Sequence, residues 1–103
     1  MALSFHKEAD NGRILISVEG EVDVSNAQEL SDILDKALAE KPTTIEVSLE
    51  KVPYIDSTGI GILVKSAHIA AENNCEFCVS HPQNNVLRVL TLLGVGSEFN
   101  LKD

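Results

Sequence analysis

Apolar and polar residues alternate in several short runs of the chain, a period of two that is typical of half-buried β-strands. The pattern is clearest in residues 13–19 and 44–49. The apolar positions of these two runs are Ile14, Ile16, Val18, Ile45, Val47 and Leu49. Strands are predicted over residues 3–8, 13–19, 44–49 and 76–80.

The segment after the second strand predicts a helix from Ser25 to about Glu40. Ser25 is the expected N-cap, and Gln28, three residues later, would complete a capping box with it. Lys41-Pro42 ends the helix because proline cannot continue it. The predicted apolar stripe consists of Ala27, Leu30, Leu34, Ala37 and Leu38.

Two further helices are predicted downstream. One begins at residues 56–59, continues to about Glu72 and is terminated by Asn73-Asn74. The other is opened by Pro82 and followed by Gly94, which has the position of a C′ glycine. The residues expected to point inward are Ile60, Leu63, Val64, Ala67 and Ala71 in the first, and Val86, Val89, Leu90 and Leu93 in the second. Phe99 and Leu101 would pack the tail as a last strand or a helical turn.

The order of these elements predicts an α/β fold. Asp10-Asn11-Gly12 favours a tight turn, because Asn and Gly tolerate positive φ, so the first two strands should form an antiparallel hairpin. Strands joined through helices imply parallel crossovers. We therefore expect a mixed sheet of about four strands with three or more helices, built from residues 1–103 as one domain.

Composition and charge narrow the choice of partner and compartment. The formal net charge is −8, which argues against nucleic acid and against anionic lipid as partners. No apolar run approaches the length of a membrane span, and the N-terminus lacks the pattern of a signal peptide. A cytoplasmic protein without membrane insertion, and without a transporter membrane region of its own, is expected.

The stretch with the clearest chemical meaning is residues 52–61, Val-Pro-Tyr-Ile-Asp-Ser-Thr-Gly-Ile-Gly, between a strand and a helix. With Asp56 as N-cap, Ser57 falls at the first helical position with its hydroxyl facing outward. Gly59 and Gly61 each cost a helix about 1 kcal/mol relative to Ala. Two such costs in one turn indicate that a protein partner or a neighbouring loop approaches this backbone closely.

A hydroxyl at a helix N-terminus is a suitable site for a phosphate. The helix dipole would stabilise the added charge by about 0.3–1 kcal/mol at an exposed position. Burial in a complex would have the opposite and larger effect, because a charge of roughly −2 would enter beside Asp56. From physical chemistry alone, however, such a cluster is more often a plain N-cap than a switch.

Two motifs at this spacing resemble the STAS family, which takes its name from sulfate transporters and anti-sigma factor antagonists. Gly20–Asp23 resembles the family's Gly-Glu-Leu/Val-Asp segment, and Val52–Gly61 resembles its Val-x-x-Ile/Met-Asp-Ser-Ser/Thr-Gly-Leu/Ile-Gly motif. The resemblance covers nearly the whole chain and is to stand-alone bacterial antagonists. It implies a STAS-like fold and a role in transcription regulation by partner switching.

For the site residues, the resemblance implies that Ser57 is phosphorylated by an anti-sigma factor that is itself a serine kinase. The unmodified form would bind that kinase and free the sigma factor, and a metal-dependent phosphoserine phosphatase would reset the switch. Thr58 is a second candidate acceptor. The partner-binding residues implied are Asp23, Asp56, Ser57, Thr58, Gly59 and Gly61.

Catalytic alternatives fit the spacing poorly. A serine hydrolase needs a base beside Ser57, but His68 lies eleven residues along the same helix, about 16 Å away at 1.5 Å per residue. There is no Gly-x-Ser-x-Gly elbow and no phosphate-binding Gly-x-x-x-x-Gly-Lys loop. His6 and His81 are interpreted as surface or strand-end residues. We therefore expect no enzymatic activity and no cofactor.

Cys75 and Cys78 have a spacing that redox and metal sites use. A thioredoxin-like pair opens a helix, whereas this pair enters a strand, where the two side chains point to opposite faces. No second pair is present to complete a zinc site. Buried or half-buried structural cysteines, and no metal, are expected.

The leading interpretation is a regulatory binding protein that is a substrate of a kinase and a phosphatase. The alternative is a structural role, as a STAS-type subunit of a signalling scaffold or of a lipid-transport complex.

Overall fold

The computed structural model describes residues 2–102, which form one five-stranded sheet in the order β1-β2-β3-β4-β5. The strands are β1 (Ser4–Asp10), β2 (Arg13–Glu19), β3 (Thr44–Lys51), β4 (Glu76–Ser80) and β5 (Asn100–Lys102). The helices are α1 (Ala27–Ala39), α2 (Ser57–Glu72), α3 (Asn84–Leu92) and a 3₁₀ turn at Val95–Ser97. The predicted mixed α/β fold is confirmed, with β5 added at the edge of the four expected strands.

The sheet is antiparallel only at its N-terminal hairpin. Asn11 and Gly12 turn the chain with φ of 52° and 80°, and β1 then pairs with β2 from Ser4↔Glu19 to Asp10↔Arg13. The pairs β2·β3, β3·β4 and β4·β5 are all parallel. Parallel strands end at the same edge of the sheet, so the loops after β2 and β3 meet there.

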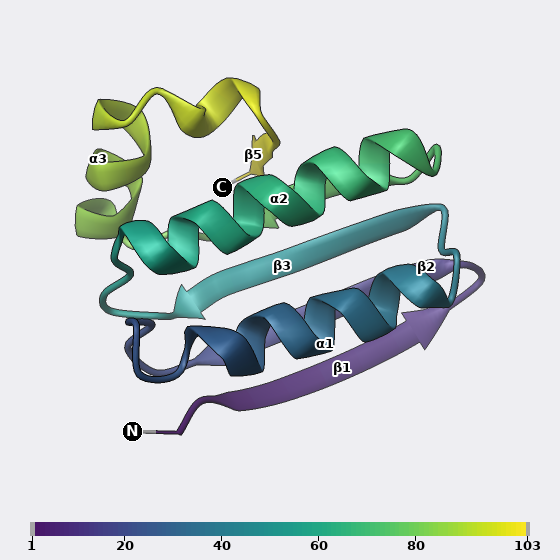
Figure 1. The fold of residues 1–103 in the computed structure, drawn as a ribbon, viewed down its shortest axis with the longest axis horizontal. Helices are drawn as coiled ribbons and strands as arrows, with labels where there is room; N and C mark the ends of the chain where they lie inside the picture. Colours follow the sequence, from purple (N-terminus) through teal and green to yellow (C-terminus); the bar gives the residue numbers. More distant parts are fainter. Residues whose placement is uncertain (1, 103) are drawn as a thin grey trace.

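Helices α1 and α2 lie side by side over one face of the sheet, and α3 lies outside this two-helix layer (Figure 1). The core between the layers is mainly aliphatic. Its largest fully buried side chains include Ile16, Leu30, Leu34, Ile45, Leu49 and Leu63. All five residues of the stripe predicted for α1 are buried.

In α2 the buried arc is rotated relative to the prediction. Ile60, Leu63 and Ala67 are buried as expected, but Val64 is only half-buried, and Ala71 is exposed. The arc also contains Gly59, Ser66 and Ala70. At 100° per residue the buried arc runs from Ser66 to Ile60, and Val64 and Ala71 lie beyond its Ile60 end. The predicted face was shifted because it included Val64 and Ala71 and left out Gly59, Ser66 and Ala70.

In the C-terminal third, the boundaries predicted from Pro82 and Gly94 are confirmed, and one predicted core residue, Leu93, is wrong. Helix α3 starts at Asn84, two residues after Pro82, and buries Val86 and Leu90. Leu93 was predicted to point inward but is 53% exposed, because it is the C-cap residue beyond the last packed turn. Gly94 then reverses the chain with φ of 68°.

The tail contains both of the alternatives expected for it, a 3₁₀ turn and a strand. Phe99 is buried, and its ring makes an edge-to-face contact with Phe77 at a centroid distance of 6.3 Å. Leu101 is half-buried in β5, opposite Val79 of β4. No helix within residues 2–102 has the length and apolar character needed to cross a lipid bilayer.

Candidate functional site

The two motifs singled out in the sequence meet at the carboxyl edge of the sheet. Val22 and Ile55 form a parallel bridge between the loop after β2 and the loop after β3. Val22 N donates to Tyr54 O at 2.9 Å, and Asp56 N donates to Val22 O at 3.1 Å. These bonds join the segment that leads into α1 to the segment that leads into α2, at the left end of both helices in Figure 1.

Asp56 caps α2 as the sequence predicts. Its backbone is extended, with φ of −96° and ψ of −178°, and its Oδ1 accepts from Thr58 N at 3.0 Å and from Gly59 N at 3.1 Å. Ser57 is therefore the first helical residue, and its side chain is exposed, as is that of Thr58. A modifying enzyme can reach the Ser57 hydroxyl without unfolding the helix.

The same cap limits what the helix can offer to an anion at Ser57. The N–H groups of Thr58 and Gly59 point out of the helix start, but the Asp56 carboxylate already accepts both. A phosphate on Ser57 would have to displace this carboxylate or stay beside it. The dipole benefit expected from the sequence is thereby reduced, and the repulsion between the two anions is increased.

Packing around the two glycines of the motif, Gly59 and Gly61, differs. A Cβ built on Gly59 would lie 2.7 Å from Val22 Cγ1 and 2.8 Å from Ile55 Cγ1, so the joined loops themselves require glycine there. A Cβ on Gly61 would meet nothing within 4 Å, and Gly61 is exposed. The neighbouring loop explains Gly59, and the fold of the described residues leaves Gly61 unexplained.

The loop after β2 is fixed by its own polar side chains. Asn26 is 3% exposed; its Oδ1 accepts from Asp23 N at 3.0 Å, and its Nδ2 donates to Glu21 O at 2.8 Å. Asp23 Oδ1 accepts from both the N–H and the hydroxyl of Ser25. The backbone and the side chain of Asp23 are thus held in place by hydrogen bonds to Asn26 and Ser25.

The capping box predicted for α1 is wrong. The N-cap residue is Asn26, without a side-chain cap hydrogen bond, and α1 begins at Ala27. The Ser25 hydroxyl donates to Asp23 instead, and Gln28 Nε2 donates to Asp32 Oδ1 at 2.9 Å. The polar groups of this loop are used to shape the turn, so they are not available to cap the helix.

The hydrogen bond from the Ser25 hydroxyl lowers the pKa of Asp23 below its ordinary value of 3.8, and the Ser25 N–H adds to the effect. A carboxyl with a lowered pKa adds stability above its unfolded-state pKa, and this contribution is lost as the pH falls through the folded-state pKa. Ser25→Ala should therefore raise the pKa of Asp23 and reduce stability above about pH 4, with the difference vanishing in stronger acid. Carbon-detected NMR titration of Asp23 checks this, and an unchanged pKa would contradict it.

Helix α3 also supports the motif loop, which the sequence did not indicate. Gln83 Nε2 donates to Glu50 O at 2.9 Å, and Asn85 Nδ2 donates to Pro53 O at 2.6 Å. Tyr54, the next residue, keeps 48% of its surface exposed. Asparagine and glutamine at a helix start have many roles, so only the folded structure shows these two amides holding the loop.

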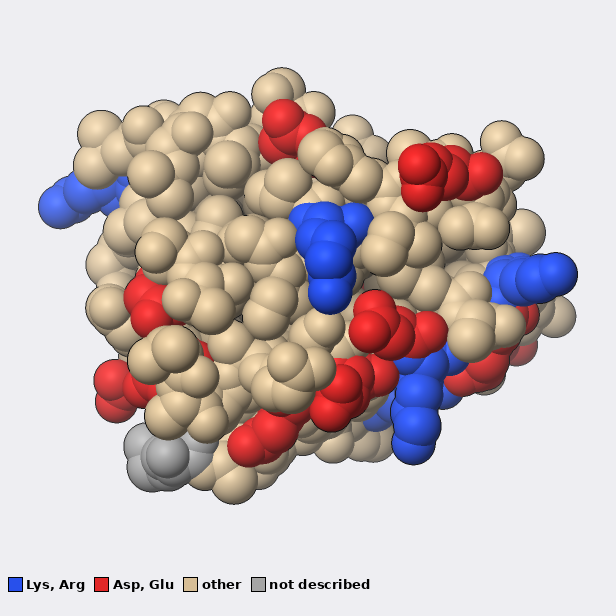
Figure 2. Space-filling view, in the orientation of Figure 1, with Lys and Arg blue, Asp and Glu red and all other residues tan. Residues whose placement is uncertain are grey.

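Acidic residues dominate the charge around the site. Figure 2 shows acidic side chains gathered along α1, which exposes Glu29, Asp32 and Asp35. Within residues 2–102 the ion pairs are His6–Glu8, Lys7–Glu40 and His68–Glu98, and none includes Asp23 or Asp56. A phosphate on Ser57 would therefore be added next to Asp23 and Asp56, neither of which forms an ion pair with a basic side chain among the described residues.

The other candidate chemical groups lie away from Ser57. Cys75 and Cys78 are buried free thiols, as expected, and burial raises the pKa of both above 9.0. Exposed His68 contacts Glu98, and His6 and His81 are exposed as predicted. In the described part of the chain no three His, Cys, Asp or Glu side chains are grouped as a metal ion requires.

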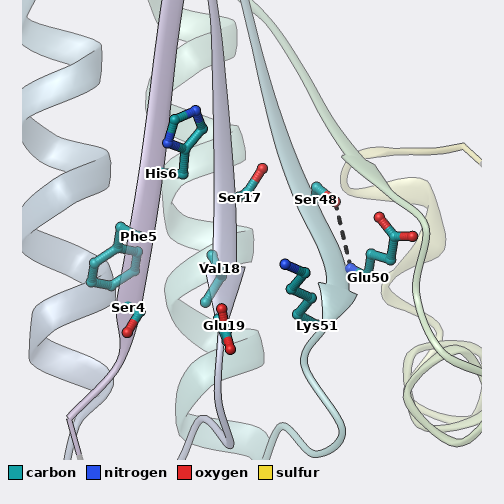
Figure 3. Close-up of a pocket in the computed structure, with 9 residues that line it drawn as sticks. All are labelled: Ser4, Phe5, His6, Ser17, Val18, Glu19, Ser48, Glu50 and Lys51. Carbon is teal, nitrogen blue, oxygen red and sulfur yellow. Dashed lines mark hydrogen bonds between the residues drawn. The ribbon is translucent and has the colours of Figure 1, made fainter.

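A shallow concavity of about 330 Å³ lies on the opposite side of the sheet from the helices, as Figure 3 shows. Its polar lining comes from the first three strands and includes Ser17, Ser48, Glu50 and Lys51. None of the residues predicted for the site lines it. The exposed site at Ser57 is therefore separate from this concavity.

Comparison with known proteins agrees with the geometry of this edge. The profile of the STAS domain matches residues 4–103. The chain belongs to the STAS family. It is 30% identical over 80 residues to the anti-sigma-B factor antagonist of Staphylococcus aureus, with 78% of this chain and 74% of that relative covered.

Two solved structures show how widely this STAS fold is shared. An anti-sigma factor antagonist from Mycobacterium paratuberculosis superposes with a TM-score of 0.88 at 24% identity, over 97% of this chain and 85% of that chain. The Bacillus cell fate determinant SpoIIAA in its phosphorylated form gives 0.74 at 19% identity, over 95% and 90%. At these identities the likeness establishes the fold alone.

Proposed function

We propose that this STAS protein, residues 1–103 acting as one unit, is an anti-sigma factor antagonist controlled by phosphorylation of Ser57. The unmodified form binds an anti-sigma factor that is a serine kinase, and the sigma factor is released. Phosphorylation of Ser57 abolishes this binding, and a phosphoserine phosphatase restores it. The protein acts in the bacterial cytoplasm as a substrate of these enzymes and has no catalytic activity of its own.

The observation that carries the proposal is the exposed hydroxyl of Ser57 at the first position of α2. It lies in a motif that resembles the family's, about one helical turn before Gly61, where an added Cβ would meet nothing within 4 Å. The relative from Staphylococcus aureus is named an anti-sigma-B factor antagonist, which supports the assignment of the partner class. The docking surface we propose consists of Asp23, Asp56, Ser57, Thr58 and Gly61. Gly59, also predicted for it, is buried and contributes only by letting the two loops join.

Electrostatics explains how one phosphate would act without refolding the chain. In the complex, water is excluded around Ser57, and a group of charge roughly −2 would stand beside the Asp56 carboxylate. A charge that is buried at an interface without a partner costs about 2–5 kcal/mol of binding free energy. This is far more than the stabilisation of about 0.3–1 kcal/mol that the helix dipole provides. Thr58, also exposed at the second helical position, is a second acceptor candidate under the same argument.

The test is a pull-down of the chain from its host followed by intact-mass analysis. We expect the unmodified form to be recovered together with an anti-sigma factor. A second pool of the protein, without the anti-sigma factor, should carry the added mass of one phosphate. The phosphate should be absent from Ser57→Ala. If no phosphate ever appears on Ser57, even with host kinases and ATP, the structural-subunit role is favoured instead.

A further inference from the structure

The loop between β2 and α1 presents an apolar side chain to solvent next to the proposed docking surface. Val24 is 77% exposed. It stands between Asp23 and Ser25, whose side chains are hydrogen-bonded to each other. No described packing or folding role accounts for an aliphatic residue at this position, where a polar residue would be equally compatible with the turn.

The position of Val24 relative to Ser57 follows from the joined loops. Val22 and Ile55 are paired, and Val24 and Ser57 each lie two residues beyond that pair. The hydrogen bonds Val22 N→Tyr54 O and Asp56 N→Val22 O fix the two segments to each other. A protein that covers Ser57 from outside would therefore also approach Val24.

The loop is also held rigid before any partner binds. Besides the side-chain bonds of Asp23 and Asn26, the backbone N–H groups of Asn26 and Ala27 donate to Asp23 O at 3.1 and 2.8 Å. Val24 has a single side-chain torsion and sits on a fixed turn, so little conformational entropy is lost when it is covered. Such preorganisation is typical of an anchor residue at an interface.

We propose that Val24 is an anchor for the anti-sigma factor, entering an apolar pocket of that partner as Ser57 is covered. The inference rests on the proposed function and specifies the partner's surface. An aliphatic pocket should be flanked there by basic side chains that face Asp23 and Asp56. A lipid surface is a poorer match, because the net charge of −8 and the adjacent Asp23 oppose approach to anionic membranes.

This contact would also strengthen the switch. An apolar side chain seated in a pocket excludes water from its surroundings, which lowers the local dielectric response. A phosphate on Ser57 then costs more than it would in an open, hydrated contact. Val24 thus acts on the same equilibrium as Ser57, through desolvation and not through charge.

The experiment measures the dissociation constant of the purified host anti-sigma factor for the full chain by isothermal titration calorimetry. Val24→Ser should weaken binding about tenfold, the effect expected when a buried aliphatic contact is lost. Leu92→Ser is the matched control, because Leu92 is 78% exposed at the other end of α3. The dissociation constant of Leu92→Ser should stay within about twofold of the parent's, and both variants should have the parent's melting temperature.

The parent and Ser57→Asp are titrated in parallel to separate the two hypotheses. If Val24→Ser binds like the parent while Ser57→Asp does not bind, the anchor role is wrong and the switch stands. If Leu92→Ser weakens binding as much as Val24→Ser, the effect is not local and the anchor role is also wrong. If the parent itself does not bind, the proposed function fails, and the anchor role fails with it.

Discussion

Replacing Ser57 with aspartate should weaken binding of the anti-sigma factor at least about a hundredfold and leave the fold unchanged. The aspartate carboxylate would be placed beside Asp56, whose oxygen is already occupied by the N–H groups of Thr58 and Gly59. The Thr58 and Gly59 N–H groups are therefore not free to compensate the new charge. When the partner covers this loop, both carboxylates lose their hydrating water while they repel each other. This desolvation and repulsion weaken the affinity for the partner.

The stability of the free protein should hardly respond, because Ser57 is exposed and an acidic residue is tolerated in the first turn of a helix. Calorimetric titration gives the affinity, and far-ultraviolet circular dichroism with thermal melting reports the fold. Ser57→Ala is the matched control, since it removes the acceptor without adding charge and should bind like the unmodified parent. Equal affinity for the parent, Ser57→Ala and Ser57→Asp would refute the switch.

The parts of the structure that the sequence predicted well are those with short-range causes. The alternation in residues 13–19 and 44–49, the turn at Asn11-Gly12 and the cap at Asp56 each depend on residues within one turn or one strand. The exposure of Ser57 then follows from its place after the cap. Local chemistry therefore predicted the cap and the exposure of Ser57, whereas its role as a phosphate acceptor was implied by the family resemblance and stays a prediction.

The errors concern choices that depend on distant segments. Asp23, Ser25 and Asn26 are all competent capping residues, and the choice among them is made by the bonds of Asn26 to Asp23 and Glu21. The tail was left open between a strand and a helical turn, because the three residues of β5 are too few for an alternating pattern and pair only with the edge of β4. Such outcomes depend on contacts that no local pattern records.

The support of the motif loop by Gln83 and Asn85 was missed for the same reason. These amides are more than thirty residues away from the carbonyls of Glu50 and Pro53 in the chain. The exposed valine of the first loop was also absent from the expected partner surface, because a single apolar residue in a polar turn carries no sequence signal. Its meaning depends on the bridge between Val22 and Ile55.

Alanine at the two motif glycines should have opposite effects on stability. Gly59→Ala places a methyl group 2.7 Å from Val22 Cγ1 and 2.8 Å from Ile55 Cγ1, both nearly fully buried, so these side chains must move. Overpacking of this kind costs about 1–3 kcal/mol, against a gain of about 1 kcal/mol from helix propensity. We expect a net loss of up to about 2 kcal/mol in the free energy of unfolding, measured by urea unfolding.

Gly61→Ala should instead stabilise the free protein by about 1 kcal/mol, because its Cβ meets nothing and the helix gains a better former. For a chain of this size that gain corresponds to a rise in melting temperature of about 4–8 °C. The same methyl group would stand on the surface proposed for docking, so the stabilised variant should bind the anti-sigma factor more weakly. A stabilised Gly61→Ala that binds like the parent would remove Gly61 from the interface. A Gly59→Ala variant as stable as the parent would mean that the joined loops yield easily, and that glycine at 59 is not required by packing.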